Sequence, residues 1–172
     1  MYKKITDNRT VEEEEAKNTA KTVGMAAIKY GDLSNQASKD YIFDIDRFIS
    51  FEGNTGPYIL YTIVRIKSIL NRYVEAGGNL EAGEILPASN GSEKNLMLQL
   101  SGFGSMIESA FEEKAPHKIC AYIYEVSNAF NSFYHETKIL SEENQAQKES
   151  YIRLLQLTKK VLETSIDLLG FE

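Results

Sequence analysis

Five side chains between residues 58 and 72 recur at a spacing that suits single-stranded nucleic acid. They are Tyr58, Tyr61, Arg65, Ser68 and Arg72. In a helix these side chains fall within roughly an 80° arc of one face. Aromatic rings stack on bases, and guanidinium groups contact phosphates or base edges. The same stripe also fits an ordinary solvated helix face with half-buried tyrosines, so the pattern alone leaves both interpretations open.

The helix that must carry this stripe is predicted over residues 58–76. Thr55 can cap its N-terminus, and Pro57 suits the first turn. The Gly77-Gly78 pair is typical of a helix end. The opposite side of this helix is apolar and predicts a core face, made by Ile59, Ile63, Ile66, Leu70, Tyr73 and Val74.

Most of the remaining chain also reads as helix. Helices are predicted over residues 10–30 with a break at Gly24, 93–100, 106–114, 117–134 and 141–169. Their expected N-caps are Thr10, Ser92 and Ser141. The last helix is expected to be deeply buried, because about half of its circumference is apolar, including Leu157, Leu162 and Leu168. Residues 40–48 begin with alternating apolar and polar side chains, which predicts a short strand or extended piece followed by a turn of helix. The fold class is therefore all-α, a helical bundle with a short N-terminal helical or extended appendage.

A second polar stripe is predicted on the helix over residues 117–134. Tyr124, Asn128, Asn131 and His135 line up opposite its apolar arc. Asparagine amides can pair with base edges if RNA is the ligand, but a polar stripe is also what a plain surface looks like.

Composition limits the classes of function. The chain has 172 residues and a formal net charge of −6, so any contact with phosphate must come from a local patch. No apolar run approaches the roughly 20 residues that a membrane span needs. The polar N-terminus is unlike a secretion signal, and the single cysteine fits a reducing compartment. We therefore expect a cytoplasmic protein without a membrane partner.

Other candidate sites have simpler interpretations. Asp44 and Asp46 could form a carboxylate pair, but alternation favours a solvated edge with Asp46 capping the next turn. His117 and His135 lie at helix ends without a second ligand at useful spacing, so no metal site is predicted. Cys120 sits in an apolar helix pattern and is expected to be a core thiol. No catalytic residue is predicted.

Several runs of the chain resemble arginyl-tRNA synthetases. The runs GMAAIKYGDLS (residues 24–34), DYIFD (40–44) and FEGNTGPYILY (51–61) are similar to the segment that joins the catalytic core of that family to its anticodon-binding domain. AYIYEVSNAFNSFY (121–134) and LLGFE (168–172) resemble the family's all-α anticodon module, the DALR domain. The similarity extends from about Glu14 to the end, with the pieces in the family's order.

The resemblance implies a class I arginine–tRNA ligase, in which ATP and arginine give an adenylate and the arginyl group passes to tRNA. The family's His-x-Gly-His pattern, its Lys-Met-Ser-Lys-like loop and its nucleotide-binding β-α units do not occur in these 172 residues. The resemblance therefore predicts a C-terminal piece that recognises tRNA and is itself catalytically inactive. ATP and Mg²⁺ belong to the parent enzyme, and no cofactor is expected in this piece. Residues 1–55 would be the stem-contact and linker segment, and residues 56–172 the anticodon-binding bundle.

The resemblance also implies which residues contact tRNA. By the family's motif, Gly53, Asn54, Tyr58, Tyr61 and Arg65 would face the anticodon loop. Asn131 and Tyr134 are a weaker carry-over, and Tyr134 could equally be a core residue. Arg72 enters from the helical stripe alone. The expected partners are the tRNA for arginine and the catalytic core of the same polypeptide, with the protein itself a monomer. The alternative is a non-catalytic helical module that binds another protein through this stripe.

Overall fold

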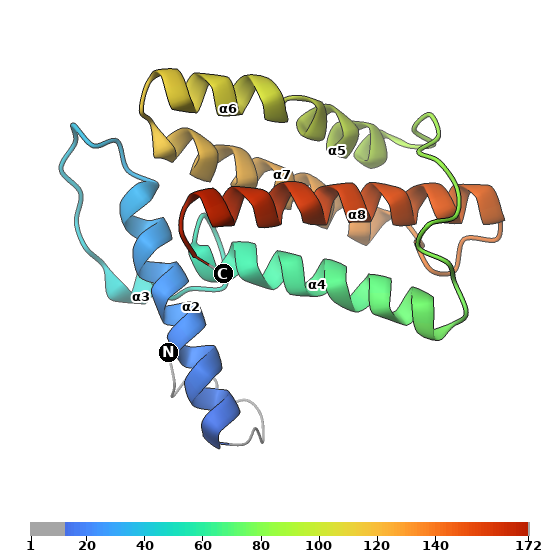
Figure 1. Ribbon diagram of the computed structural model, residues 1–172, viewed down its shortest axis with the longest axis horizontal. Coiled ribbons are helices and arrows are strands. Elements are labelled where there is room, and N and C mark those ends of the chain that lie inside the picture. The colour runs from blue at the N-terminus through green and yellow to red at the C-terminus, as the bar shows by residue number, and fades with distance from the viewer. Residues whose placement is uncertain (1–12, 172) are drawn as a thin grey trace.

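The computed structural model describes residues 13–171, and every regular element in that range is a helix (Figure 1). The helices are α2 (Glu13–Leu33), α3 (Ile45–Phe48), α4 (Gly56–Glu75), α5 (Gly91–Ser101), α6 (Phe103–Glu112), α7 (Pro116–Glu136) and α8 (Gln145–Leu168). This architecture confirms the predicted all-α class. Among these helices, none combines the length and the apolar character that crossing a membrane requires.

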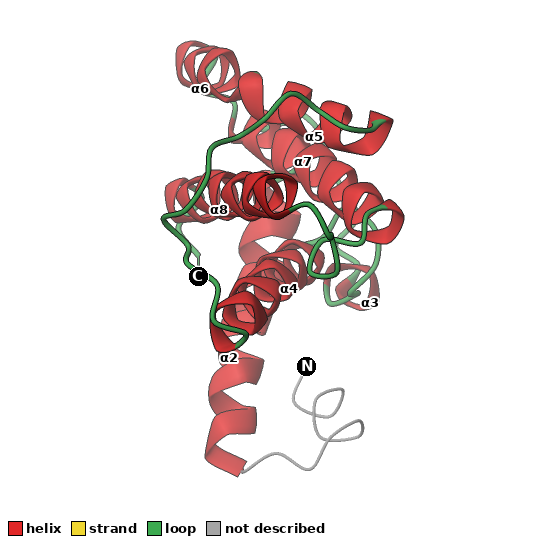
Figure 2. Cartoon of the chain, turned by 90° about the vertical axis from the view of Figure 1, so that its right-hand side faces the viewer, coloured by secondary structure: helices red, strands yellow, loops and turns green. Residues whose placement is uncertain are grey.

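Helix α7 occupies the centre of the bundle. It packs against α4, α5, α6 and α8, while α2 lies across the start of α4. Figure 2 shows α5 and α6 on one side of α7 and α8, with α4 on the other side. The fully buried apolar side chains come from every layer of this arrangement. They include Tyr30, Ile59, Ile66, Leu96, Ile123, Phe130, Phe133, Ile152, Leu155 and Leu162. The apolar faces of the amphipathic helices thus meet in one core.

The ends of α4 follow from local sequence as predicted. The Thr55 hydroxyl accepts a hydrogen bond from the Tyr58 amide at 3.3 Å, which satisfies one amide that the first turn leaves without a helical partner. At the other end, Gly77 adopts φ +86°, a conformation that side chains disfavour. The Gly78 amide then donates to the Tyr73 carbonyl at 2.9 Å, which closes the helix in a Schellman arrangement.

Helix α2 crosses α4 at very short range. Gly56 begins α4 and lies against the backbone of Ala26, and Gly31 lies against the ring of Phe48. Both glycines are buried. The absence of a Cβ at these two positions lets the helices and the α3 segment approach closely. The crossing thereby fixes the direction from which the residue 50–55 loop enters α4 (Figure 1).

Of the predicted strand or extended piece within residues 40–48, no strand forms, and Asp44 has extended backbone angles. The predicted helical turn that follows is confirmed. Residues 40–44 have no regular structure, and no strand is present in residues 13–171 to pair with them. Their side chains are held locally instead, since the Tyr41 ring stacks on Phe48 at 6.1 Å between centroids. Asp44, and not Asp46, caps α3, because Asp44 immediately precedes the first helical residue and its carboxylate accepts two backbone amides at 3.1 Å.

Three other expectations about helix boundaries need correction. Helix α2 passes through Gly24 without a break. Asn90 caps α5 and Asn144 caps α8, in place of the predicted Ser92 and Ser141, because the capping side chain must stand directly before the first helical residue. The expected cap Thr10 lies outside the described residues.

Three apolar residues assigned to the interior are exposed. Val74, Leu157 and Leu168 have exposed fractions of 48%, 39% and 57%. Each lies at the margin of an apolar arc, where a neighbouring helix no longer covers the surface. The centres of the same arcs, such as Ile66 on α4 and Leu162 on α8, are fully buried as predicted.

The buried core predicts that stability falls in alkali. Burial raises the pKa of Cys120 from 9.0 to about 12 and the pKa of Tyr122 from 10.0 to about 12, and it also raises the pKa of Tyr30. The unfolded chain therefore releases these protons first, so stability is complete below pH 9 and is lost progressively between pH 9 and pH 12. Each group that ionises only in the unfolded chain contributes a slope of about 1.4 kcal/mol per pH unit.

Urea unfolding measured at several pH values above neutrality tests this expectation. A Cys120→Ala variant should lose the part of the decline that begins nearest pH 9, because its unfolded chain has one fewer early proton to release. An unfolding free energy that stays constant up to about pH 11 would contradict the assigned burial.

Candidate nucleic-acid interface

Helices α4 and α7 bring five of the eight predicted site residues together. Tyr58, Tyr61 and Arg65 lie on the α4 face toward α7, and Asn131 and Tyr134 lie on the facing side of α7. The two helices pack against each other in the core, which sets the spacing between these side chains. We call these five residues the α4–α7 cluster.

Tyr58 is partly buried and packs against the core. Its hydroxyl donates to Asn128 Oδ1 at 2.9 Å and accepts from Asn131 Nδ2 at 2.8 Å. Its ring packs edge-on against Tyr124, with centroids 5.8 Å apart. Partial burial raises the pKa of Tyr58, opposed by the hydrogen bond from Asn131. Both hydrogen bonds of the Tyr58 hydroxyl therefore link α4 to α7.

Arg65 lies between the two exposed rings of the cluster. Its guanidinium carbon is 4.7 Å from the centroid of the Tyr61 ring and 5.2 Å from that of Tyr134. Nη1 donates to Asn131 Oδ1, and Nη2 donates to the Tyr61 hydroxyl at 3.1 Å. Among the described residues, no carboxylate lies within ion-pair distance of Arg65. The arrangement therefore holds a planar, unneutralised cation in a fixed orientation.

The cluster opens to solvent along its aromatic edge. Tyr61 is 48% exposed and Tyr134 is 38% exposed, so Tyr134 is not a core residue. Phe51, from the loop before α4, meets the Tyr61 ring edge-on at 6.5 Å between centroids. His135 packs against Tyr134 at 5.4 Å. Exposed rings around a fixed guanidinium can stack on bases while the cation contacts a phosphate or a carbonyl edge.

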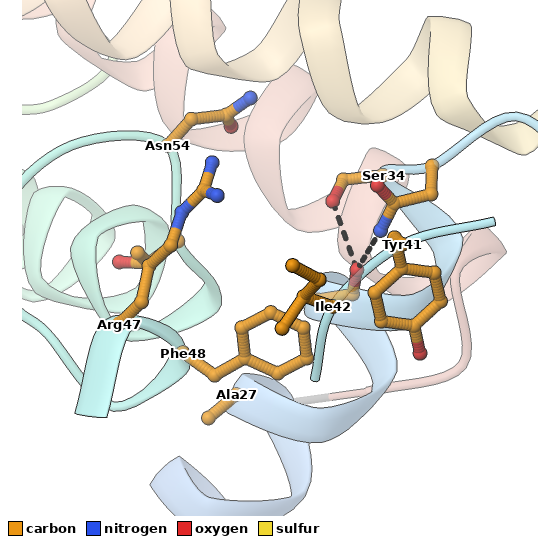
Figure 3. Close-up of a pocket in the computed structure, with 10 residues that line it drawn as sticks. Ala27, Ser34, Tyr41, Ile42, Arg47, Phe48 and Asn54 are labelled. Carbon is orange, nitrogen blue, oxygen red and sulfur yellow. Dashed lines mark hydrogen bonds between the residues drawn. The ribbon is translucent and has the colours of Figure 1, made fainter. Parts of the chain in front are cut away.

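The loop before α4 continues this surface toward α2 and α3. Gly53 is exposed with φ +77°, and Asn54 is exposed beside it. The Asn54 side chain lies within hydrogen-bond distance of the buried Tyr30 hydroxyl of α2. Figure 3 shows Asn54 near Arg47 at the mouth of a pocket of about 230 Å³, where Phe48 lies in the wall. Asn54 thus connects the loop to α2 and is separate from the ring-lined edge.

Arg72 lies apart from the α4–α7 cluster. It is eleven residues beyond Tyr61, which is about 16 Å along the helix axis. It is exposed and borders a pocket with Gly77, Gly78 and Lys148 near the C-terminal end of α4. A chain of nucleotides crossing α4 could reach both positions, but the two arginines do not form one site.

Phe51 and Tyr30 are functional candidates that sequence reasoning missed. Phe51 belongs to a loop whose path no helical period describes. Tyr30 lies on the buried face of α2 and looks like an ordinary core residue. The signal that could have indicated Tyr30 is its hydroxyl, because a buried phenol needs a hydrogen-bond partner.

A model of the DALR anticodon binding domain matches residues 59–172. That match covers most of the chain, including all of α7 and most of α4. The chain belongs to the DALR anticodon-binding domain family. The family match begins inside α4, so α2, α3 and the loop before α4 precede the matched part. The predicted division of the chain near residue 55 stays a prediction.

Curated relatives extend the similarity across the residues before the DALR match. An arginine–tRNA ligase of Agathobacter rectalis is 69% identical over 167 residues, covering 96% of this chain and 28% of the relative. One of Alkaliphilus oremlandii is 52% identical over 172 residues, covering 100% of this chain and 29% of the relative. The chain therefore spans less than a third of the length of these relatives.

Solved structures carry the same fold as this DALR-family chain. Thermus thermophilus arginyl-tRNA synthetase superposes with a TM-score of 0.81 and 27% identity, covering 96% of this chain and 28% of that one. Arginyl-tRNA synthetase from Plasmodium falciparum gives a TM-score of 0.80 and 28% identity, covering 91% and 27%. The resemblance predicted from the sequence is confirmed.

Proposed function

We propose that this chain is the tRNA-recognising part of an arginine–tRNA ligase. The α4–α7 cluster carries the proposal, because it places exposed rings and a fixed guanidinium on a domain whose family binds anticodons. The long relatives are named arginine–tRNA ligases, and the parent reaction we propose joins arginine to its tRNA with ATP. ATP and Mg²⁺ would be held by the remaining part of such a ligase, and this chain alone would not aminoacylate. The parent reaction belongs to the cytoplasm, where we place the protein as a monomer.

Recognition would use the groups that remain unsatisfied in the cluster. Arginine has five N–H donors, and Arg65 directs two side-chain nitrogens at Asn131 and Tyr61. The remaining donors have no hydrogen-bond partner among residues 13–171 and would suit a phosphate oxygen or a base carbonyl. An unstacked anticodon base would lie on the exposed ring of Tyr61, with Phe51 or Tyr134 at its edge. Gly53 and Asn54 would contact the backbone of the same loop.

Electrostatics make the expected affinity modest. With a net charge of −6, attraction for RNA must come from local cations such as Arg65 and Arg72. Two phosphate contacts to a single-stranded loop predict a slope of about −1.4 for the logarithm of affinity against the logarithm of salt. Binding by the isolated chain should therefore be salt-sensitive without being dominated by charge.

Titration of an arginine tRNA and an unrelated tRNA against this chain, at about 50 and about 200 mM salt, tests the proposal. We expect the arginine tRNA to bind more tightly at both concentrations, with the shallow slope above. Equal affinity for both tRNAs would remove the recognition role. Absence of binding to either one would favour the alternative, in which the ring-lined edge docks a protein.

A further inference from the structure

The hydroxyl of Tyr30 joins three segments that are distant in the sequence. Tyr30 is fully buried on α2, and its ring meets Phe171 edge-on at 6.2 Å between centroids. The oxygen lies 2.8 Å from the Cys120 carbonyl of α7 and within hydrogen-bond distance of Asn54 Oδ1. One phenol oxygen thus contacts the start of α7 and the loop before α4.

The chemistry of these groups favours a directional chain of hydrogen bonds. A phenol has one proton, so Tyr30 can donate fully to only one of the two oxygens. All groups are satisfied if Tyr30 donates to the Cys120 carbonyl and the Asn54 amide, turned by 180°, donates from Nδ2 to the Tyr30 oxygen. Burial raises the pKa of Tyr30, so the proton stays in place throughout the neutral range.

The hydrogen bonds within the loop before α4 join its own residues and do not reach the core. The Thr55 hydroxyl donates to the Ser50 carbonyl at 2.6 Å, the Glu52 amide to the Ser50 hydroxyl at 3.1 Å, and the Thr55 amide to the Gly53 carbonyl at 3.0 Å. Gly53 has a left-handed backbone conformation, and a glycine can adopt many other backbone conformations. Asn54 stands between Gly53 and Thr55 and is exposed, so its side-chain bond to Tyr30 anchors the tip of the loop to the core.

We propose that Tyr30 is a positioning residue for tRNA recognition, holding the residue 50–55 loop through Asn54. The proposal rests on the proposed function, because the loop supplies Gly53 and Asn54 to the tRNA surface. The same loop carries Phe51, which packs on Tyr61, so Tyr30 would also influence the position of the Phe51 ring. Tyr30 itself touches no tRNA, since it has no exposed surface. Its effect passes from the core to the surface through a single side chain.

The variant Tyr30→Phe isolates the hydroxyl, because it keeps the ring and its packing. We expect tRNA affinity to fall about three- to tenfold, the loss that one net hydrogen bond represents. Asn54→Ala should lose at least as much affinity, since it removes a proposed tRNA contact as well as the hydrogen bond to Tyr30. Adding Tyr30→Phe to Asn54→Ala should cause no further loss, because that hydrogen bond is already absent. Additive losses would show that the two residues act separately and would overturn the proposal.

A matched control comes from a second buried phenol. Tyr151 is 3% exposed, and its hydroxyl lies 3.0 Å from Ser89 Oγ in a different loop. Tyr151→Phe removes a buried hydroxyl of the same kind without touching the loop before α4. Its tRNA affinity should equal that of the parent. An equal loss in Tyr151→Phe and Tyr30→Phe would mean that general destabilisation, and not loop positioning, weakens binding.

A measurement without tRNA separates this proposal from the proposed function. In the full chain, NMR hydrogen exchange at the Thr55 amide, which donates to the Gly53 carbonyl at 3.0 Å, should be faster in Tyr30→Phe than in the parent, while amides of α8 are unchanged. Unchanged exchange at the loop overturns the positioning role, whatever the tRNA result. Faster exchange in a chain that binds no tRNA would overturn the proposed function. The hydrogen bond between Tyr30 and Asn54 would then hold the loop without a role in tRNA recognition.

Discussion

The Tyr61→Ala variant is expected to lose tRNA affinity by about 1–3 kcal/mol, or roughly 5- to 150-fold, with no loss of helix. Tyr61 offers the most exposed ring of the α4–α7 cluster, and removing it takes away the surface on which a base would stack. It also removes one wall that orients the Arg65 guanidinium. Titration of arginine tRNA measures the affinity, and far-UV circular dichroism measures the helical content.

Tyr61→Phe is the matched control for that experiment. The phenylalanine keeps the ring and its contact with Phe51 but cannot accept the hydrogen bond from Arg65 Nη2. Its loss of affinity should be much smaller than that of the alanine variant, because stacking depends on the ring. Parent-like affinity in Tyr61→Ala would exclude stacking on this ring. Equal losses in both variants would assign the effect to the hydroxyl and to Arg65.

The helical period found one half of the cluster before the structure did. A spacing of three and four residues puts Tyr58, Tyr61 and Arg65 on one side of α4, and the cap at Thr55 fixes where that period begins. Periodicity describes one helix at a time, however, and does not indicate which other helix packs against that face. Arg65 and Tyr58 both hydrogen-bond to Asn131 of α7, and these contacts depend on how α4 and α7 pack. The partial burial of Tyr58 therefore could not be predicted from α4 alone.

The errors in the fold prediction share a physical cause. Gly24 weakens a helix by about 1 kcal/mol relative to alanine, yet α2 continues because its neighbours Val23, Ala26 and Ala27 are buried. Residues 40–44 alternate like a strand, but a strand requires a partner that residues 13–171 do not supply. In both places tertiary context overrides a local preference.

Gly56→Ala is expected to destabilise the protein by about 1–3 kcal/mol, the cost of forcing extra volume into a closed packing contact. A Cβ at this position would lie 2.4 Å from the Ala26 carbonyl oxygen and 2.7 Å from the Ala26 carbonyl carbon. Both are backbone atoms of α2, so no side-chain rotation can relieve the overlap. The two helices would have to separate. Urea unfolding of the variant and the parent measures the difference.

Gly24→Ala supplies the opposite case in the same region. A Cβ on Gly24 would meet nothing within 4 Å, and alanine is favoured over glycine inside a helix by about 0.5–1 kcal/mol. That variant should therefore be more stable than the parent, while Gly56→Ala is less stable. Two variants of the same sign would contradict the assigned crossing of α2 and α4. Since Tyr30 reaches the loop from α2 one turn beyond Ala26, separating the helices in Gly56→Ala should also weaken tRNA binding.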